Sequence, residues 1–338
     1  MNLKKLSKRV RIVLLCLFTV LLILLSWGTA EWFQIDSAYM KGESRIYTVQ
    51  KGKKAIDVMA DLSDKPLSPY WSQLWLRVHP EYRLIKAGTY KIEKGWHLKH
   101  ALQLFVSGKE AVFSVTLVEG KRIDDWLDTL AQAPYLSETM SVSDISLIRH
   151  SLDIEQQNPE GWFLPETYSY TAGSTPLDIL RRAHNDMVTF LDKAWKGRDR
   201  SVPYKSAYEA LIMASIIEKE TANSGERAKI ASVFMNRLKK GMKLQTDPTV
   251  IYGVKDRYDG VIHRSDLDDV NPYNTYIITG LPPTPIAMPS KKSILAALHP
   301  DKTNYLYFVA KGQGGEHNFS ITLDQHNQAV KHYLQSKK

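Results

Sequence analysis

The chain has 338 residues, of which 43% are hydrophobic and 24% are charged, with eight tryptophans and seventeen tyrosines. This composition is that of a globular protein with one large or two modest cores, and it excludes an intrinsically disordered chain. Much of the net charge of +9 comes from five basic residues at the N-terminus: Lys4, Lys5, Lys8, Arg9 and Arg11. Because the remainder is nearly balanced, the charge predicts no nucleic-acid-binding surface.

An apolar run, IVLLCLFTVLLILLSWGTA, occupies residues 12–30 directly after the basic tail of residues 1–11. A helix of that length is about enough to cross a ~30 Å hydrocarbon layer. Since basic flanks stay in the cytoplasm, we expect one transmembrane anchor with its N-terminus inside and the rest of the chain outside. A cleaved signal peptide is the alternative, although the run exceeds the usual ~7–15-residue signal core. The only cysteine, Cys16, lies in this run, so the exported part has no thiol nucleophile and no disulfide.

A first small module is expected over residues 44–112, after a short polar linker at residues 31–43. Apolar spacing and Lys-Gly turns predict a strand, a turn and a helix, twice in succession. The expected elements are a strand over 46–49, a helix over 56–62, a strand over 90–92 and a helix over 98–105 that ends near Gly108. This order resembles the opening of a LysM-like peptidoglycan-binding module, and a plain α+β subdomain is the alternative.

The rest of the chain, residues 113–338, is expected to form a larger α+β domain. The patterns predict a buried strand within 112–120, helices over 121–130 and 176–195, a helix from Ala207, and a helix capped by Asn223 and stopped by Gly241. Between them, NPEGWFLPETYSY breaks regular structure. Its aromatic side chains are expected to pack together: Trp162, Phe163, Tyr168 and Tyr170. This loop is either a hydrophobic clasp or the wall of a site that contains Glu166.

The stretch LIMASIIEKE places Glu218 at the end of an apolar run. Such a setting suits a carboxyl group that keeps its proton near neutral pH, because burial disfavours the charged form. Glu220, two positions later, projects about half a turn away on a helix and cannot share that orientation. The alternative is that Glu218 is an ordinary charge at a helix end, paired with Lys219 or Arg227.

Two polar segments that follow are candidates for a substrate groove. MKLQTDPTVIYG carries Gln245 and Asp247, and NPYNTYIITGLPPTPIAMPS carries Tyr273, Asn274 and Tyr276 among five prolines. A long, ordered, irregular segment of this kind is typical of a binding groove. Flat aromatic faces and amides suit a sugar with an acetamido group. A packed proline-rich loop is the alternative.

Other chemistries lack their motifs in this sequence. There is no H-E-x-x-H spacing, G-x-S-x-G elbow, Walker loop or dinucleotide fingerprint. The glycine-rich KGQGGEHNFS follows a strand as a hairpin turn and opens no helix, which argues against phosphate binding. We therefore expect neither a metal nor a cofactor.

Several segments together resemble the successive motifs of the endolytic murein transglycosylases, the MltG or YceG-like family: EGWFLPETYSY, ASIIEKET, ASVFMNRLKKGMKLQTDPTVIYG, NPYNTYIITGLPPTPIAMPS, SILAALHP, YLYFVA and HNFS. The match runs in order across residues 44–330, and the N-terminal anchor fits it. The resemblance implies a bacterial inner-membrane enzyme with a periplasmic catalytic domain. Such an enzyme cleaves peptidoglycan strands internally between N-acetylmuramic acid and N-acetylglucosamine and terminates strand growth. It implies peptidoglycan synthases as partners.

The same resemblance makes Glu218 the catalytic glutamate. In a lytic transglycosylase the C6 hydroxyl of the muramic ring is the nucleophile, giving a 1,6-anhydro end, so one residue can act as acid and then as base. A hydrolytic muramidase would need a second carboxyl group, and Glu166 is the candidate. The expected substrate-binding residues are Glu166, Glu220, Gln245, Asp247, Tyr273, Asn274 and Tyr276. A non-catalytic wall-binding scaffold is the alternative from another class.

Overall fold

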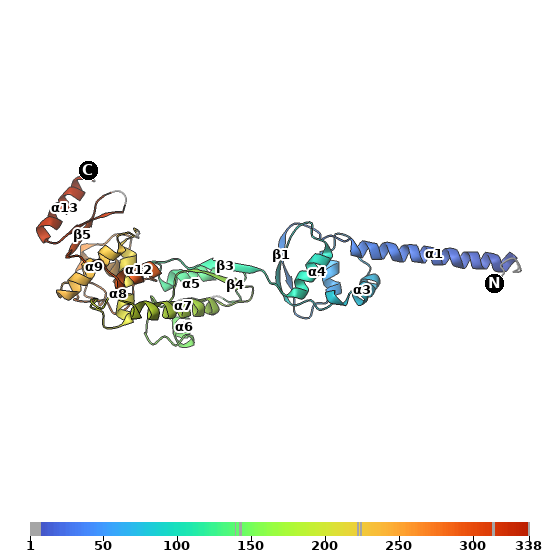
Figure 1. Cartoon of the computed structure of the whole chain (residues 1–338), viewed down its shortest axis with the longest axis horizontal. Helices are drawn as coiled ribbons and strands as arrows, with labels where there is room; N and C mark the ends of the chain where they lie inside the picture. The colour runs from blue at the N-terminus through green and yellow to red at the C-terminus, as the bar shows by residue number, and fades with distance from the viewer. Residues whose placement is uncertain are drawn as a thin grey trace. The chain divides into compact units, whose positions relative to one another are not determined.

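The computed structural model describes residues 8–138, 140–141, 144–221, 223, 225–312 and 315–336. Residues 1–7 of the expected cytoplasmic tail, and part of the glycine-rich segment after residue 310, therefore lie outside the described residues. Two compact units divide the chain, Met1–Phe113 and Ser114–Lys338. Both contain helices and a two-stranded sheet, so the mixed α and β composition is as predicted (Figure 1).

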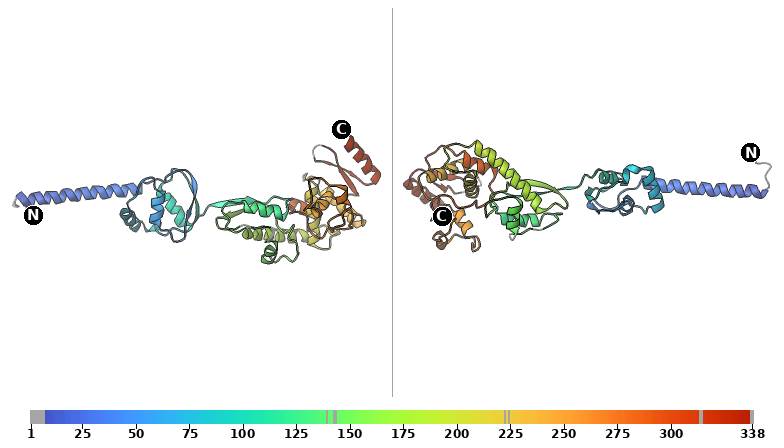
Figure 2. Two further views of the ribbon diagram at one scale, coloured as in Figure 1. Left: turned by 180° about the vertical axis from the view of Figure 1, so that it is seen from behind. Right: turned by 90° about the horizontal axis from the view of Figure 1, so that it is seen from below.

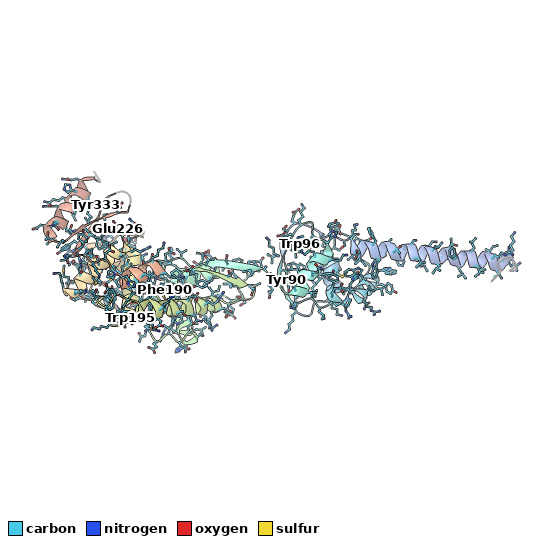
Figure 3. All side chains as sticks on the ribbon, viewed as in Figure 1. Tyr90, Trp96, Phe190, Trp195, Glu226 and Tyr333 are labelled. Carbon is cyan, nitrogen blue, oxygen red and sulfur yellow. The ribbon has the colours of Figure 1, made fainter. Side chains whose placement is uncertain are left out.

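The first unit contains α1 (Lys8–Asp36), β1 (Arg45–Val49), α2 (Ala55–Leu62), α3 (Pro69–Val78), the 3-10 turn η2 (Pro80–Tyr82), β2 (Gly88–Ile92) and α4 (Leu98–Ser107). β1 pairs with β2 in antiparallel register, Arg45 opposite Ile92. The helices α2, α3 and α4 pack beside this pair around a core that includes Trp75, Tyr90 and Phe105 (Figure 3 labels Tyr90). Gly108 ends α4 in the left-handed region at φ 72°, where glycine carries no side-chain penalty.

Helix α1 is continuous through the apolar run and into the first unit. Among the described residues it is the one helix long and apolar enough to cross a membrane. The segment expected to be a short polar linker, residues 31–43, contributes apolar side chains to the core of the first unit. The helix extends to Asp36, Ala38 and Met40 are buried, and the Met40 amide donates to the carbonyl of Trp96 at 2.9 Å (Figure 3).

The second unit begins with β3 (Val112–Thr116), which crosses the boundary between units, and continues with α5 (Ile123–Ala131), α6 (Ile145–Ser151), β4 (Thr167–Thr171), α7 (Pro176–Lys196), α8 (Ala207–Glu220), α9 (Arg227–Lys239), α10 (Asp247–Gly253), α11 (Arg264–Leu267), α12 (Lys291–Leu298), β5 (Tyr307–Ala310), β6 (His317–Ser320) and α13 (Leu323–Ser336). β3 pairs with β4, and β5 pairs with β6 in antiparallel register.

Helix α8 is the central helix of the second unit. Every residue from Ala210 to Ile217 is buried, against α7, α9, α10 and α12. The sequence predicted burial of one face, but the helix is surrounded on all sides, as expected for a run that is apolar all round. Ser206 caps its start by accepting from the amide of Glu209 at 3.2 Å. The charged residues 218–220 therefore follow directly after a fully buried stretch of helix.

The C-terminal hairpin and α13 lie beside α9 (red in Figures 1 and 2). Glu226, the residue before α9, accepts a hydrogen bond from the amide of His317 on β6 at 3.1 Å (Figure 3 labels Glu226). β5 contacts α9, and α13 contacts β5. This packing brings residues 307–309 of β5 and 323–330 of α13 next to the end of α8 and the segment that follows α9.

Three local predictions for this unit were wrong. The strand expected within 112–120 is β3, and of its five residues only Val115 is buried, with Leu117 buried directly after it. Residues 167–171 of the segment expected to be irregular form strand β4. The ring of Trp162 stacks on that of Tyr208 at 5.6 Å, and the ring of Phe163 lies 6.4 Å from that of Trp126. Asn223 does not cap α9, because its side chain closes an earlier turn by accepting from the amide of Gly225 at 3.0 Å.

Candidate active site

Glu218 forms a buried ion pair at the end of α8. Its side chain is 4% exposed, and Oε1 accepts from Nη2 of Arg227 at 3.0 Å. Oε2 accepts from the amide of Ser290 at 2.8 Å and from the hydroxyl of the same residue. Three donors thus compensate the carboxylate for its lost hydration. The interaction with Arg227 matches the structural alternative considered from the sequence, although the pair is buried and not solvated.

Glu220 has a different environment from Glu218, as the half-turn between them predicted. Its carboxyl group accepts a hydrogen bond from the hydroxyl of Thr246. Desolvation raises the pKa of Glu220 to about 7. The hydrogen bond from Thr246 lowers this pKa, the negative charge of Asp247 raises it further, and the positive charge of Arg237 lowers it. Near neutral pH this carboxyl group therefore exists in both its protonated and its ionised form.

A cavity of about 440 Å³ opens beside Glu220. Its polar wall contains Glu220, Arg237, Gln245, Thr246, Asp247 and Tyr276. Its other wall is largely apolar and comes from β5 and α13: Tyr307, Phe308, Val309, Leu323, His326 and Val330. The Tyr276 hydroxyl donates to Oδ1 of Asp247 at 2.6 Å, which joins the two polar segments across the wall. Four of the residues expected at a substrate groove are therefore brought together here, whereas Glu218 is held by Arg227 and Ser290.

Arg237 organises the polar wall of this cavity, and the sequence did not single it out. Nε donates to the carbonyl of Leu306 at 2.6 Å, and Nη1 donates to the carbonyl of Leu244 at 2.8 Å and to Oε1 of Gln245 at 3.4 Å. Gln245 itself has φ 50°, an uncommon conformation for a residue with a side chain. The guanidinium fork thus fixes the backbone on both sides of the cavity. In the sequence, Arg237 is distinguished only by its position on α9, three residues after the buried Phe234.

Asn274 and Tyr273 support the cavity from behind. Asn274 is fully buried, and its side-chain amide donates to the carbonyls of residues 266, 267 and 269. Its Oδ1 accepts from the amide of Tyr276 at 3.0 Å. The Tyr273 hydroxyl forms a 2.9 Å hydrogen bond with Thr284. In the described part of the chain neither residue lines this cavity, and Asn274 holds the backbone of Tyr276 in place.

Glu166 lies in a second cavity, of about 780 Å³, between β4 and α7. Its Oε1 accepts from Nζ of Lys291 at 2.6 Å. Lys291 follows Ser290, the residue that binds Glu218. The cavity wall also contains Arg182, Asp186 and Lys193, but not Glu220. The structure therefore keeps Glu166 apart from the cavity at Glu220.

Comparison with known proteins places these features in a family. The model of the YceG-like family matches residues 47–332. The chain belongs to the YceG-like family. A protein named endolytic murein transglycosylase from Bacillus subtilis (strain 168) is 36% identical over 269 residues, covering 75% of this chain and 74% of that protein. A protein of the same name from Streptococcus pneumoniae (strain D39) is 26% identical and covers 77% of this chain and 52% of that protein.

A solved structure of a YceG-like protein from Listeria monocytogenes shares the fold. It has a TM-score of 0.51 and 26% sequence identity, and the match covers 85% of this chain and 99% of that one. Every cavity residue named above lies within the part of the chain that the YceG-like model matches. Among the described residues no group of three or more His, Cys, Asp and Glu side chains is placed to hold a metal ion.

A second buried glutamate, Glu160, was also missed by the sequence analysis. It is 2% exposed and accepts from the amide of Ile123 at 3.0 Å, at the first turn of α5. Burial raises its pKa to about 8, and the hydrogen bond from Ile123 opposes the rise. Its other oxygen accepts from the hydroxyl of Tyr252 at 3.3 Å. Because both oxygens have protein donors, Glu160 ties α5 to α10 in this YceG-like unit.

Proposed function

We propose that this YceG-like chain is an endolytic lytic transglycosylase of peptidoglycan, and that Glu220 is its acid–base residue. The names of its relatives support the reaction class. The observation that carries the assignment of the residue is the carboxyl group of Glu220 at the wall of a polar-lined cavity, with its pKa raised to about 7. An acid whose pKa lies near the working pH donates and accepts protons with equal facility.

The proposed reaction needs one carboxyl group. Protonated Glu220 gives its proton to the glycosidic oxygen as the bond from C1 of the muramic ring to that oxygen breaks. The C6 hydroxyl of the same ring then bonds to C1, and its proton returns to the Glu220 carboxylate. The products are a 1,6-anhydro end and a free 4-hydroxyl, and Glu220 is protonated again. The Tyr276 and Asp247 pair and Gln245 offer hydrogen bonds to sugar hydroxyl and acetamido groups.

Glu218, to which the resemblance points, is less suited to this step by its contacts. Both of its oxygens already accept hydrogen bonds from Arg227 or Ser290. Adding a proton to either oxygen would remove one of these interactions and leave the Arg227 guanidinium without its counter-ion. We therefore propose that Glu218 fixes the end of α8, and that its catalytic assignment is the rival hypothesis.

The test digests purified peptidoglycan with the wild type, Glu220→Gln and Glu218→Gln, and identifies strand ends by mass spectrometry. We expect anhydro ends from the wild type and from the folded fraction of Glu218→Gln, and none from Glu220→Gln. Anhydro ends that persist with Glu220→Gln but vanish with a fully folded Glu218→Gln would return the role to Glu218. Reducing ends would support a hydrolytic muramidase that uses Glu218 with Glu166, and wild-type protein that cleaves nothing would support a wall-binding scaffold.

We also propose that α1 anchors the protein in the bacterial inner membrane, with its N-terminus cytoplasmic and both units periplasmic. Its length and hydropathy support the anchor, and the basic residues before it support the orientation. The first unit is proposed to be a LysM-like module that holds peptidoglycan. The order β1, α2, α3, β2 with antiparallel pairing of the two strands supports this interpretation. Peptidoglycan synthases at the same membrane are the proposed protein partners.

A further inference from the structure

The C-terminal end of α1 is packed against α3 within the first unit. Gly28 is buried on this contact, where a Cβ atom would lie 2.8 Å from the ring of Trp71. The rings of Trp27 and Trp71 meet edge to face at 6.1 Å and 85°. Further along α1, Nε2 of Gln34 donates to the carbonyl of Pro66 at 2.7 Å. Glycine at position 28 thus permits the close approach that makes α1 and α3 one packed body (Figure 1).

This contact fixes the depth of α3 along the apolar helix. Gly28 lies two residues before Ala30, the end of the apolar run, which is about 3 Å along the helix axis. A segment that touches α1 at Gly28 is therefore level with the end of the hydrocarbon layer when α1 crosses it. Trp71 is the third residue of α3, and Tyr70 precedes it. The first turn of α3 is thus at the height of the lipid headgroups.

Large aromatic side chains are exposed at that height. Tyr70 is 70% exposed and meets Trp71 edge to face at 5.5 Å. Trp27 is 53% exposed and Phe33 is 72% exposed. Tryptophan and tyrosine favour the boundary between lipid and water, where the ring is apolar and one edge can be hydrated. Exposed aromatic rings are unfavourable in water. The surface that these rings form is continuous with the exposed apolar surface of α1, which points to lipid as the partner.

We infer that the first unit sits on the headgroup layer of the bilayer crossed by α1, with Tyr70, Trp27 and Phe33 inserted in the interface. The inference rests on the proposed membrane anchor. It adds that the anchor is joined to the first unit by a rigid contact and not by a flexible linker. The height and orientation of the glycan-holding module above the membrane are then set by α1 and α3 together.

The experiment places a fluorescent NBD label in the full-length protein in vesicles of phosphatidylcholine and phosphatidylglycerol. One protein keeps native Cys16 as the label site, inside the apolar run. Two others carry Cys16→Ser with either Tyr70→Cys or Lys51→Cys, the latter exposed in the turn after β1, away from α1 (Figure 1). Nitroxide lipids with the spin label near the headgroup or deep in the acyl chain then quench emission according to depth.

We expect the label at position 70 to be blue-shifted and to lose most of its emission to the shallow quencher, while the label at 51 behaves as in water. The label at Cys16 reports the anchor separately, through the deep quencher. Quenching at 16 with none at 70 would overturn the inference and leave the anchor standing. Absence of quenching at 16 would overturn both.

A matched pair of substitutions tests whether the α1–α3 contact sets the depth. Gly28→Leu places a side chain where Trp71 lies, whereas Thr29→Leu adds the same side chain at an exposed position of the same helix. With Gly28→Leu we expect the label at 70 to lose its shallow quenching while the label at 16 keeps its deep quenching. With Thr29→Leu the quenching of both labels, at 70 and at 16, should match that in the parent protein. Equal quenching at 70 in the two variants would contradict the positioning role of the contact.

Discussion

Replacing Glu218 by glutamine leaves the size and most of the shape of the side chain unchanged but removes its charge. Arg227, whose side chain is 9% exposed, then becomes a buried cation without a counter-ion. Breaking a buried ion pair from one side costs about 3–5 kcal/mol. The Ser290 amide and hydroxyl can still donate to the glutamine carbonyl. We therefore expect a loss of about 3 kcal/mol of stability, at the low end of that range. The loss should appear where α8, α9 and the start of α12 meet.

Hydrogen exchange measured by mass spectrometry on peptides from α8 and α9 gives this local free energy of opening. The control is Lys196→Gln, which breaks an exposed pair with Asp192 at 2.6 Å and should cost no more than about 1 kcal/mol. Adding Arg227→Met to Glu218→Gln should recover part of the loss, since no buried charge remains unpaired. Unchanged protection of α8 in Glu218→Gln would refute the view that this carboxylate has a structural role.

Three further predictions follow from other side chains. Because Glu220 must be protonated to donate, kcat/KM should fall as pH rises through about 7, and a flat profile between pH 5 and 9 would contradict the acid role. The folded-state pKa of Glu160 is raised to about 8 from an ordinary value of 4.5, so its contribution to stability is full below pH 4.5 and is lost as pH rises to 8. In denaturant titrations, the free energy of unfolding of Glu160→Gln should decline less steeply with pH over that range than that of the wild type. Identical slopes of unfolding free energy against pH would refute this. Asn274→Ala removes a side-chain donor from the carbonyls of residues 266, 267 and 269 and should cost about 1–3 kcal/mol of unfolding free energy, measured by denaturation, while the conservative Asn274→Asp cannot restore it.

Helices α5, α7 and α8 of the second unit were predictable because their signals are local. Thr175 caps α7 next to Pro176, and Ser206 caps α8, as the sequence patterns around them indicate. The N-terminus of α9 was not predictable in the same way. Asn223 has the right residue type for a cap, but its side chain closes the preceding turn instead.

The candidate site depends on contacts that no local pattern records. The two glutamates of EKE looked equivalent apart from their orientation, and the apolar run before Glu218 favoured that residue. What separates them is Arg227 and Ser290 on one side and Thr246 with Arg237 on the other, from segments far apart in the sequence. The wall supplied by β5 and α13 comes from residues 307–309 and 323–330. Desolvation of Glu220 is a consequence of this tertiary packing.

In the first unit, too, contacts between distant segments could not be predicted from local sequence patterns. Residues 31–43 are polar enough to suggest a linker, yet their few apolar side chains complete the core with α3 and α4. Gly28 lies within the apolar run of residues 12–30, where the sequence gives no sign of a contact partner. Its use as the contact point for Trp71 is visible only once α3 is folded beside α1.

The most direct test of the central claim is the strand-end analysis of peptidoglycan treated with Glu220→Gln. Glutamine keeps the size of the side chain and can accept from Thr246, but it has no proton to give to a glycosidic oxygen. The account predicts a folded protein that produces no 1,6-anhydro ends under conditions in which the wild type produces them. Anhydro ends formed by Glu220→Gln at the wild-type rate would contradict it.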